Sequence, residues 1–284
     1  MGGTTSSDEE ENMFDRLMAQ KAARNLEKLK DKKPLIHNIT NFVVMNYTAN
    51  ALLACGASPV MAHAQEEVEE MASFAGALVL NIGTLTPYWI ESMIKAGRQA
   101  NEAKIPIILD PVGSGATKLR TDSAKRLIDE IAISVVRGNA SEVLSLAHED
   151  SRTKGVDSIH SVDDAADAAV ILAKELNTTL AITGAVDLVT DGKIIYRVSN
   201  GHELMGYVTG TGCTATVIIA AFLAVDSNPV EATTTALAYF GLAGEKAAAR
   251  ADVPGSFQIA LLDSLYSIDS TQMEEGAKIQ HVRS

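Results

Sequence analysis

The stretch IPIILDPVGSGATKLRTDSAKRLIDEIAISVVRGN, residues 105–139, indicates the fold of this protein. Its apolar start, Ile105–Leu109, predicts a buried strand that ends at Asp110. A helix is predicted over Asp122–Ile131, and a second short apolar strand, Ser134–Val136, follows that helix. Two strands joined through a helix pair in parallel, because a helical crossover returns the chain to the edge where the first strand began. The stretch therefore predicts an α/β protein with a parallel sheet.

The same alternation of strand and helix continues on both sides of this stretch. Further strands are predicted near Pro34–His37 and at Ser58–Met61, Ala77–Asn81, Thr179–Thr183, Leu188–Thr190 and Ile194–Val198. Further helices are predicted at Asn46–Cys55, Gln65–Ala75, Thr86–Ala103, Asp163–Leu176, Thr214–Ala224, Pro229–Arg250 and Gln258–Leu265. The dipeptide Asp191-Gly192 indicates a hairpin turn. Short connections between alternating elements predict a mainly parallel sheet covered by helices on both faces, a three-layer α/β/α sandwich.

Length and composition fit a single domain. The chain has 284 residues, of which 46% are hydrophobic and only 5% aromatic, so aliphatic side chains must fill the core. A helix is predicted over Met13–Lys30, and the acidic residues 1–12 before it are expected to form a disordered tail. The polar stretch Glu149–Ser158 is interpreted as a surface loop within one domain, residues 13–284.

Charge and cysteine content exclude several classes of protein. A net charge of −12 disfavours binding to nucleic acid or to an anionic membrane, although an anionic cofactor needs only a local positive site. The chain has no apolar run of about 18 residues, and its first residues do not resemble a signal peptide. Two cysteines, Cys55 and Cys213, are too few for a disulfide framework, and we therefore expect a cytoplasmic protein.

The segment LMGYVTGTGCTAT, residues 204–216, combines a glycine turn with the start of a helix. We expect a short apolar strand, then a turn whose glycines adopt backbone angles that other residues avoid, so that successive N–H groups converge. The helix adds unpaired N–H groups and a positive dipole end, which together make an anion hole suited to phosphate. The residues of this hole are Gly210, Thr211, Gly212 and Cys213.

Cys213 lies at the mouth of the predicted anion hole. A thiol at a helix N-terminus tends to have a lowered pKa, although a thiol near its reference pKa of about 8.5 is mostly protonated at neutral pH. The alternative is a buried cysteine beside an ordinary glycine turn.

Two acidic residues follow neighbouring strands of the predicted sheet. Asp110 comes directly after the first strand quoted above, and Glu142 lies in the first turn of a helix after the second. Ligands of open α/β sheets bind beyond the carboxyl ends of the strands, and Mg²⁺ prefers few carboxylates together with water and phosphate oxygens. The pair predicts a magnesium site. The alternatives are a turn-forming Asp before proline and a Glu that only stabilises the helix dipole.

Polar residues at two more strand ends suit a bound phosphate or nucleotide. The Arg137 guanidinium would hold a phosphate through two hydrogen bonds, and Asn139 offers amide contacts. Thr183 and Gly184 would allow close approach of a nucleotide to the backbone. The alternatives are a surface salt bridge for Arg137 and an ordinary turn for the other pair.

The stretch PLIHNITNFVVMNYTAN, residues 34–50, is rich in asparagine but otherwise apolar. Apolar walls with a few polar groups suit a small heterocycle, for which Asn41 and the nearby Met61 are candidate contacts. The alternatives are helix-capping asparagines and a core methionine. We expect His37 to be a structural histidine rather than a base.

Taken in order, these motifs resemble the hydroxyethylthiazole kinase family of the ribokinase-like superfamily. The resemblance extends from about Pro34 to Leu262. It rests on the stretch 34–50 and on the motifs ASPVMAHAQEEVEEM, GALVLNIGTL, ILDPVGSGAT, RGNASE, AITGAVD, NGHELM, VTGTGC and PGSFQIALLD. It implies a ribokinase-like fold and a homotrimer with active sites between subunits. It also implies ATP- and Mg²⁺-dependent phosphorylation of the hydroxyl of 4-methyl-5-(2-hydroxyethyl)thiazole, a step of thiamine biosynthesis and salvage.

The resemblance also implies roles for individual residues. ATP would bind at Arg137 and Thr183, with Asn139 and Gly184 beside them. Mg²⁺ would bind at Asp110 and Glu142. The thiazole would contact Met61, Gly210 and Asn41. Cys213 occupies the position where most ribokinase-like kinases carry an aspartate base, and this family is similar to the chain in having cysteine there. The helix dipole would lower the pKa of this thiol, whereas bound ATP would raise it. Because phosphoryl transfer depends mainly on positioning and charge stabilisation, we interpret Cys213 as orienting the substrate hydroxyl and helping to accept its proton.

Three other functions remain open at this stage. A related kinase acting on the hydroxymethylpyrimidine precursor would share the ATP site and differ only around residues 34–50 and 57–61, which match the thiazole family. A nucleotide-binding regulator without catalysis would not need Asp110, Glu142, Arg137 and Cys213 together. A Rossmann dehydrogenase would require a G-x-G-x-x-G motif after the first strand, which the sequence lacks.

Overall fold

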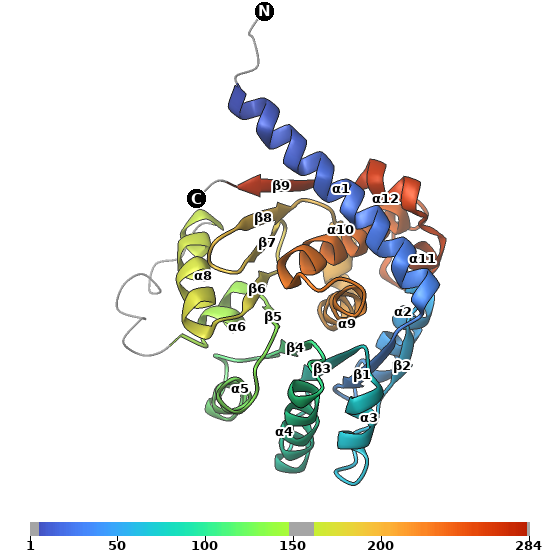
Figure 1. Ribbon diagram of the computed structural model, residues 1–284. Coiled ribbons are helices and arrows are strands. Elements are labelled where there is room, and N and C mark those ends of the chain that lie inside the picture. The colour runs from blue at the N-terminus through green and yellow to red at the C-terminus, as the bar shows by residue number, and fades with distance from the viewer. Residues whose placement is uncertain (1–5, 148–161, 283–284) are drawn as a thin grey trace, which may run out of the picture.

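A continuous sheet forms the middle layer of the protein (Figure 1). The computed structural model describes residues 6–147 and 162–282, with side chains from Met13 in the first helix and from Ala166 after the gap. Within these residues the strand order is β2-β1-β3-β4-β5-β6-β7-β8-β9. The strands are β1 Leu35–Ile39, β2 Ser58–Val60, β3 Ala77–Asn81, β4 Ile107–Asp110, β5 Val135–Gly138, β6 Thr179–Ile182, β7 Asp187–Thr190, β8 Ile195–Val198 and β9 Ile279–Val282.

The sheet is parallel from β2 to β6 and antiparallel from β6 to β9. The helices that join and cover the strands are α1 Ser6–Lys32, α2 Met45–Cys55, α3 Val68–Phe74, α4 Pro87–Glu102, α5 Lys118–Glu130, α6 Ala140–Leu144, α8 Val162–Leu176, the 3₁₀ helix η2 Glu203–Tyr207, α9 Thr211–Leu223, α10 Pro229–Ala248, α11 Pro254–Ser267 and α12 Ser270–Gly276. No helix in the described part of the chain is both long and apolar enough to cross a membrane.

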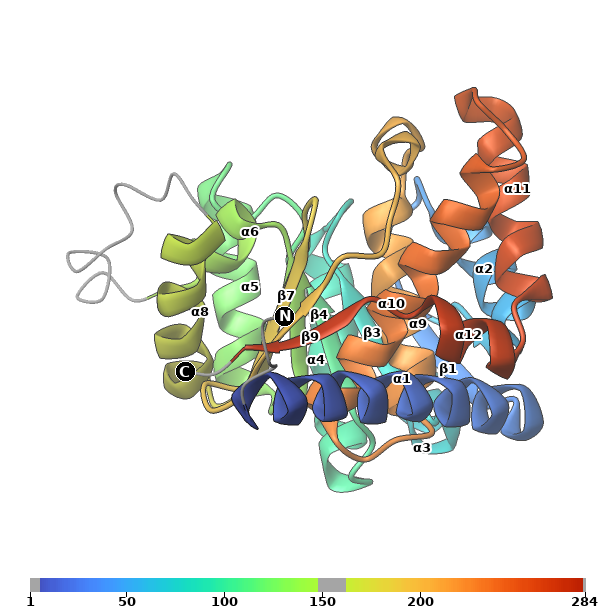
Figure 2. The same cartoon turned by 90° about the horizontal axis from the view of Figure 1, so that it is seen from above.

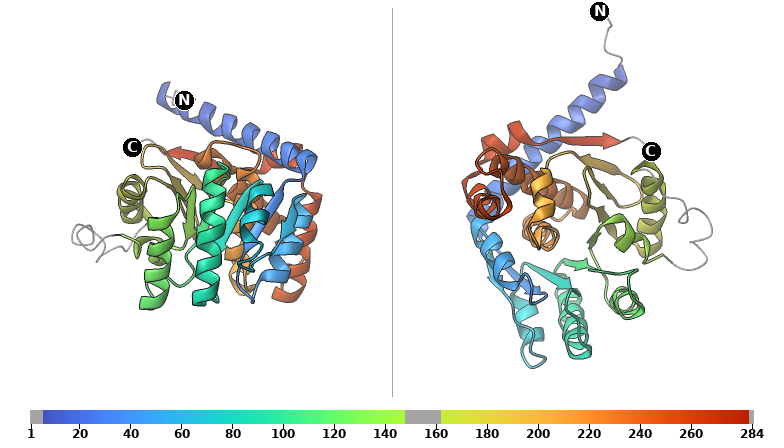
Figure 3. Two further views of the ribbon diagram at one scale, coloured as in Figure 1. Left: turned by 60° about the horizontal axis from the view of Figure 1, so that its bottom comes forward. Right: turned by 180° about the vertical axis from the view of Figure 1, so that it is seen from behind.

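Both faces of the sheet are covered, as Figures 2 and 3 show. Strand residues alternate between two cores, so that Val79 packs with α9 and α10 while Leu78 and Leu80 pack with α3, α4 and α5. Helix α9 is apolar on all sides because it lies between the sheet and α10, and its residues from Thr214 to Leu223 are buried. The three-layer α/β/α prediction is therefore confirmed.

Several elements differ from the sequence-based expectations. The segment before the glycine turn is the 3₁₀ helix η2 rather than a strand. The strand before it, β8, already pairs with β7 on one side and with β9 on the other, so η2 has no sheet edge beside β8 to join. Neither β9 nor α12 was predicted; both pack on α1. Helix α1 begins at Ser6, inside the stretch that was expected to form a tail. The expected surface loop at 149–158 lies outside the described residues.

Candidate active site

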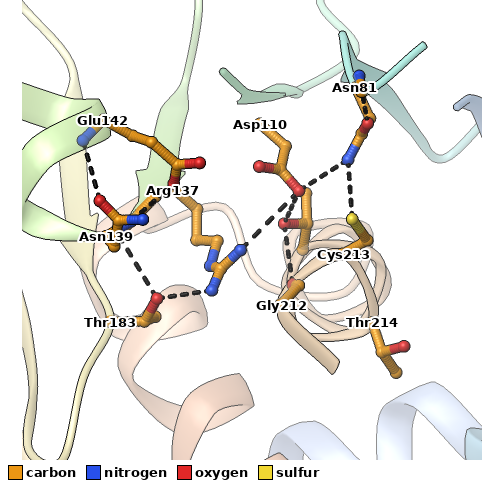
Figure 4. A network of polar contacts seen from close by, with 12 residues as sticks. Asn81, Asp110, Arg137, Asn139, Glu142, Thr183, Gly212, Cys213 and Thr214 are labelled. Atoms are coloured by element: carbon orange, nitrogen blue, oxygen red, sulfur yellow. Dashed lines mark hydrogen bonds and ion pairs between the residues drawn. The ribbon is translucent and has the colours of Figure 1, made fainter. Parts of the chain in front are cut away.

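The carboxyl ends of the parallel strands meet at one edge of the sheet, next to the N-terminus of α9 (Figure 4). Asn81 ends β3 and Asp110 ends β4, and the two residues lie opposite each other in the strand register. Arg137 lies within β5 rather than after it. The fold thus brings the polar residues of separate motifs to the start of the helix that carries Cys213.

The glycine turn has the geometry of an anion hole, and its two glycines are needed for different reasons. Gly210 caps α9 with φ +84°, in the left-handed region, and a Cβ there would lie 2.5 Å from Val44 Cγ1. Gly212 is not among the described residues with positive φ. A Cβ on it would lie 2.8 Å from Arg137 Nη1, so Gly212 allows the guanidinium to approach. The first turn leaves N–H groups without partners inside the helix.

The thiol of Cys213 belongs to a buried hydrogen-bond network. Asn81 Nδ2 donates to Cys213 Sγ at 3.2 Å and to Asp110 Oδ2 at 2.7 Å. Asn41 Nδ2 donates to Asn81 Oδ1 at 2.8 Å and lies 3.7 Å from the same sulfur. Because Asn81 Oδ1 also accepts from the Gly83 N–H at 2.9 Å, the orientation of the Asn81 amide is determined by its partners. The sulfur is therefore held as an acceptor.

The structure raises the pKa of Cys213, although the N-terminus of a helix by itself would lower it. Burial, followed by the nearby charge of Asp110, raises the pKa of this thiol to about 12. The hydrogen bonds from Asn81 and Asn41 and the charge of Arg137 act in the opposite direction but do not outweigh burial. Cys213 is thus a protonated thiol at neutral pH.

Asp110 is a nearly fully buried carboxyl group, with 1% of its surface exposed. Its Oδ2 accepts from Asn81 and from Thr216 Oγ1 (2.9 Å) and lies 3.8 Å from Arg137 Nη1, whereas its Oδ1 is buried without a hydrogen-bond partner among the described residues. Burial raises the pKa of Asp110, and the Arg137 charge opposes that shift. A buried oxygen with no donor suits a bound cation.

Glu142 forms a capping box with Asn139 at the start of α6. Its Oε2 accepts from the Asn139 N–H and its Oε1 from the Gly113 N–H, both at 2.9 Å. The helix-capping interpretation therefore describes its contacts, and each oxygen keeps a lone pair for a further ligand. No group of three or more His, Cys, Asp or Glu residues able to hold a metal occurs in the described part of the chain. Two carboxylates fit Mg²⁺ when waters and phosphates complete its ligands.

Arg137 connects the network to a pocket. Its Nη2 donates to Thr183 Oγ1 at 2.5 Å, and Thr183 N donates to the Gly138 carbonyl at 2.9 Å. The side chain is 11% exposed, so the surface salt-bridge interpretation of Arg137 is wrong. The guanidinium lies between Asp110, Thr183 and the backbone of Gly212, at the anion hole (Figure 4).

The pocket has a volume of about 530 Å³ and extends from Arg137 toward α10. Asn139, Thr183 and Gly184, which the sequence grouped with Arg137, all line it, together with Thr211 and Gly212 of the turn. Apolar groups also line it, from Met205, Ala215, Leu237, Phe240 and Gly241. The size and the mixture of polar and apolar lining suit a nucleotide.

Met61 lies apart from this pocket, directly after the edge strand β2. The loop that carries it is anchored by His37, whose Nε2 lies 2.7 Å from the Ala62 carbonyl oxygen, and by His63, which stacks on Trp89 at 4.2 Å. Burial lowers the pKa of His37, which agrees with the expected structural role. The order β2-β1-β3 places Met61, Asn41 and Asn81 at successive strand ends.

Sequence reasoning missed two polar residues of the site. The position of Asn81, at the end of a buried strand and before Ile82-Gly83, could have indicated a site residue. The neighbouring sequence does not show that its partners are Asp110 and Cys213. Asp187 lines the pocket and starts β7, and it was considered only as part of the AITGAVD motif.

Comparison with known proteins agrees with the motifs. The sequence model of the hydroxyethylthiazole kinase family matches residues 26–271. The hydroxyethylthiazole kinase of Desulfotalea psychrophila is 64% identical over 259 residues, which cover 91% of this chain and 95% of that protein. The hydroxyethylthiazole kinase of Desulfosudis oleivorans is 54% identical over 266 residues, 93% of this chain and 97% of that protein.

Solved structures give the same result for the fold. The hydroxyethylthiazole kinase of Pyrococcus horikoshii OT3 superposes with a TM-score of 0.86 at 48% identity, over 93% of this chain and 99% of that one. The pyridoxal kinase of Staphylococcus aureus, solved with ADP, has a TM-score of 0.62 at 17% identity, over 88% and 99% of the two chains, and shares the ribokinase-like fold. This chain is a kinase that belongs to the hydroxyethylthiazole kinase family.

Proposed function

We propose that the protein transfers the γ-phosphoryl group of ATP to the hydroxyl of 4-methyl-5-(2-hydroxyethyl)thiazole, with Mg²⁺, in thiamine biosynthesis or salvage. One observation carries this proposal: Cys213, Asp110 and Arg137 meet at the N-terminus of α9, next to a pocket of about 530 Å³. The relatives named above, at 54–64% identity, support the thiazole as acceptor.

The nucleotide would lie in this pocket with its phosphates at the anion hole. Arg137 and the N–H groups of the Gly210–Cys213 turn would hold phosphate oxygens, while Thr183 orients the guanidinium through its hydroxyl. Asn139 and Gly184 would contact the nucleotide from the neighbouring strand ends. These donors are rigidly placed, which is what stabilisation of a loose phosphoryl-transfer transition state requires.

The thiazole would bind on the side of the turn that faces β1 and β2. Met61 would supply an apolar wall and Asn41 a polar contact, and Gly210 would allow the ring to approach the backbone. This arrangement directs the hydroxyethyl group toward Cys213, because Asn41 lies 3.7 Å from its sulfur.

Asp110 and Glu142 would hold Mg²⁺, since the unpartnered Asp110 Oδ1 and the remaining lone pairs of Glu142 suit a hard cation. The bound ion supplies positive charge that neutralises the phosphate oxygens. Arg137 adds a second positive charge beside Asp110, at 3.8 Å.

Cys213 would act by position, and as a proton acceptor only when its thiol is ionised. Its raised pKa, about 12, keeps the thiol protonated before reaction, so it orients the acceptor hydroxyl rather than removing its proton in advance. As the bond to phosphorus forms, the hydroxyl becomes strongly acidic and its proton would pass to a phosphate oxygen, while the sulfur, which already accepts from Asn81, would accept a hydrogen bond from that hydroxyl. Cys213 would take the proton itself only as a thiolate.

We further propose that the enzyme is a cytoplasmic homotrimer with active sites between subunits. Met61 follows the edge strand β2, where a neighbouring subunit would complete a thiazole pocket. Light scattering coupled to size exclusion tests this assembly: a mass three times that of the 30.1 kDa chain supports it, and a monomer contradicts it.

Coupled ADP release with ATP and Mg²⁺ tests the reaction itself, with hydroxyethylthiazole and hydroxymethylpyrimidine assayed in parallel. We expect turnover with the thiazole alone. Turnover with the pyrimidine alone would overturn the assignment of residues 34–50 and 57–61, and nucleotide binding without turnover would indicate a regulator.

A further inference from the structure

The polar residues of the nucleotide pocket follow the order of the strands. Arg137 lies on β5, Thr183 and Gly184 directly follow β6, Asp187 starts β7, and Asn200 comes just after β8. Since β5, β6, β7 and β8 are consecutive neighbours in the sheet, these residues form a row along one wall of the pocket.

The two ends of this row have different chemistry. The Arg137 end adjoins Gly212 and the N-terminus of α9, which attracts phosphate. At the other end, a Cβ on Gly241 would lie 2.5 Å from the Asn200 backbone, so Asn200 adjoins the apolar wall of α10 that suits a flat base. Asp187 lies between the two ends and would therefore face the middle of a nucleotide bound along the row.

The carboxyl group of Asp187 is held in a defined place. Its Oδ1 accepts from the Gly184 N–H at 3.0 Å, and the residue pairs with Val198 of β8 in the antiparallel register. Burial raises the pKa of this group to about 6, against the charge of Arg137, so the carboxylate is ionised at neutral pH and its desolvation is incompletely compensated. Glu203 also lines the pocket but is exposed on η2.

A carboxylate repels phosphate and gains nothing from an apolar base face, but it accepts strongly from hydroxyl groups. In dinucleotide sites, an acidic side chain binds the ribose 2′-hydroxyl for the same reason. We propose that Asp187 binds the ribose hydroxyls of the nucleotide and makes the enzyme select ribonucleotides over 2′-deoxyribonucleotides. This inference rests on the proposed function, in which ATP is the phosphoryl donor.

Calorimetric binding of ADP, 2′-deoxyADP and 2′,3′-dideoxyADP to the wild-type protein tests the proposal without turnover. We expect each deoxy nucleotide to bind at least about 10-fold more weakly than ADP, because a hydrogen bond to a charged group is lost. In Asp187→Ala, the ratio of the dissociation constants of 2′,3′-dideoxyADP and ADP should fall below about 2, because ADP alone loses affinity.

Two further variants make the result specific. Asp187→Asn keeps an oxygen that can accept from the Gly184 N–H, so it should fold even if the alanine variant does not. Because the charge is lost, its preference for ADP over the deoxy nucleotides should be smaller than that of the wild type but not abolished. Asp191→Ala removes a carboxylate from the turn at the far end of β7, where it accepts from the Lys193 and Ile194 N–H groups, and should keep the wild-type ratio.

Equal affinity of the wild type for all three nucleotides, or an unchanged ratio in the folded Asp187→Ala and Asp187→Asn variants, would overturn the inference. The proposed function fails separately. Absence of ADP release with thiazole, with ribose discrimination intact, removes the reaction but keeps the role of Asp187. Thiazole-dependent turnover without ribose discrimination keeps the proposed reaction but removes the role of Asp187. Absence of ADP binding would overturn both the proposed function and the role of Asp187.

Discussion

The Asn81 amide nitrogen lies 3.2 Å from Cys213 Sγ and 2.7 Å from Asp110 Oδ2, so one side chain donates to both groups. If Cys213 ionised beside the buried Asp110 carboxylate, two negative charges would lie unfavourably close together. The two N–H bonds of a single amide place a donor between them. Asn81 therefore links the substrate side of the site to the side that would hold the metal.

Replacing Asn81 tests this link. Asn81→Leu keeps the approximate volume but removes both donors, and we expect kcat to fall about 10- to 100-fold, as for other lost donors at a reacting centre. Alkylation of Cys213 by iodoacetamide should also become slower, because the hydrogen bond from Asn81 lowers the thiol pKa.

The matched control is Asn50→Leu, on the exposed face of α2, where the side chain donates to Asn46. This variant should keep wild-type kcat and alkylation rate. An unchanged kcat in a folded Asn81→Leu variant would refute the positioning role.

Substitution of Cys213 separates positioning from proton transfer. We expect Cys213→Ala to lower kcat but to leave measurable activity, because the anion hole and Arg137 remain. Cys213→Asp should retain or exceed wild-type activity, since a carboxylate accepts a proton more readily at neutral pH. Steady-state rates of both variants check this, and complete loss in a folded, ATP-binding alanine variant, or an inactive aspartate variant, would disprove it.

The pH dependence of the wild type gives an independent test of Cys213. Because burial raises the thiol pKa to about 12, no ionisation of Cys213 should appear in kcat between about pH 6 and 9. A pH-rate step in that range that disappears in Cys213→Ala would contradict a protonated thiol.

Gly212→Ala should weaken nucleotide binding without unfolding the protein. The added Cβ would lie 2.8 Å from Arg137 Nη1 and displace the guanidinium, while φ at this residue is not positive. We expect the KM for ATP to rise about 10-fold or more, with little change in the KM for the thiazole. Gly255→Ala, where a Cβ would meet no atom within 4 Å, is the control, and equal kinetics of the two variants would be the contrary result.

Asp187→Asn should stabilise the nucleotide-free protein in a pH-dependent way. Burial raises the pKa of Asp187 in the folded protein from 3.8 to about 6. The free energy of unfolding therefore falls as pH rises from about 4 to about 6, because the folded protein must then hold an ionised, buried carboxylate, and this loss is complete at pH 7.5. The variant should gain about 1–3 kcal/mol in the free energy of unfolding at pH 7.5 and almost none at pH 4. Urea unfolding at both pH values measures this, and a loss of stability at pH 7.5 would exclude it.

Much of the fold followed from local patterns. Apolar runs such as Ala77–Asn81 and Thr179–Thr183, separated by helical stretches, were enough to predict parallel strands and their shared carboxyl edge. The Asp191-Gly192 hairpin was also correct, because a tight turn depends on its own residues. The terminal strand β9 was missed because Ile279–Val282 is short and gains its partner only when β8 and α1 are already in place.

The sequence by itself determined which residues stand at the strand ends and where the glycine turn places N–H groups, because periodicity and backbone freedom are properties of neighbouring residues. Only the tertiary structure decided what those residues do to one another. It buried Cys213 next to Asp110, which raises the thiol pKa that the helix terminus alone would lower. It also made Gly212 a contact for Arg137 and brought Asp187 into the pocket. Desolvation and charge pairing depend on distances between segments far apart in the chain, and no local pattern contains those distances.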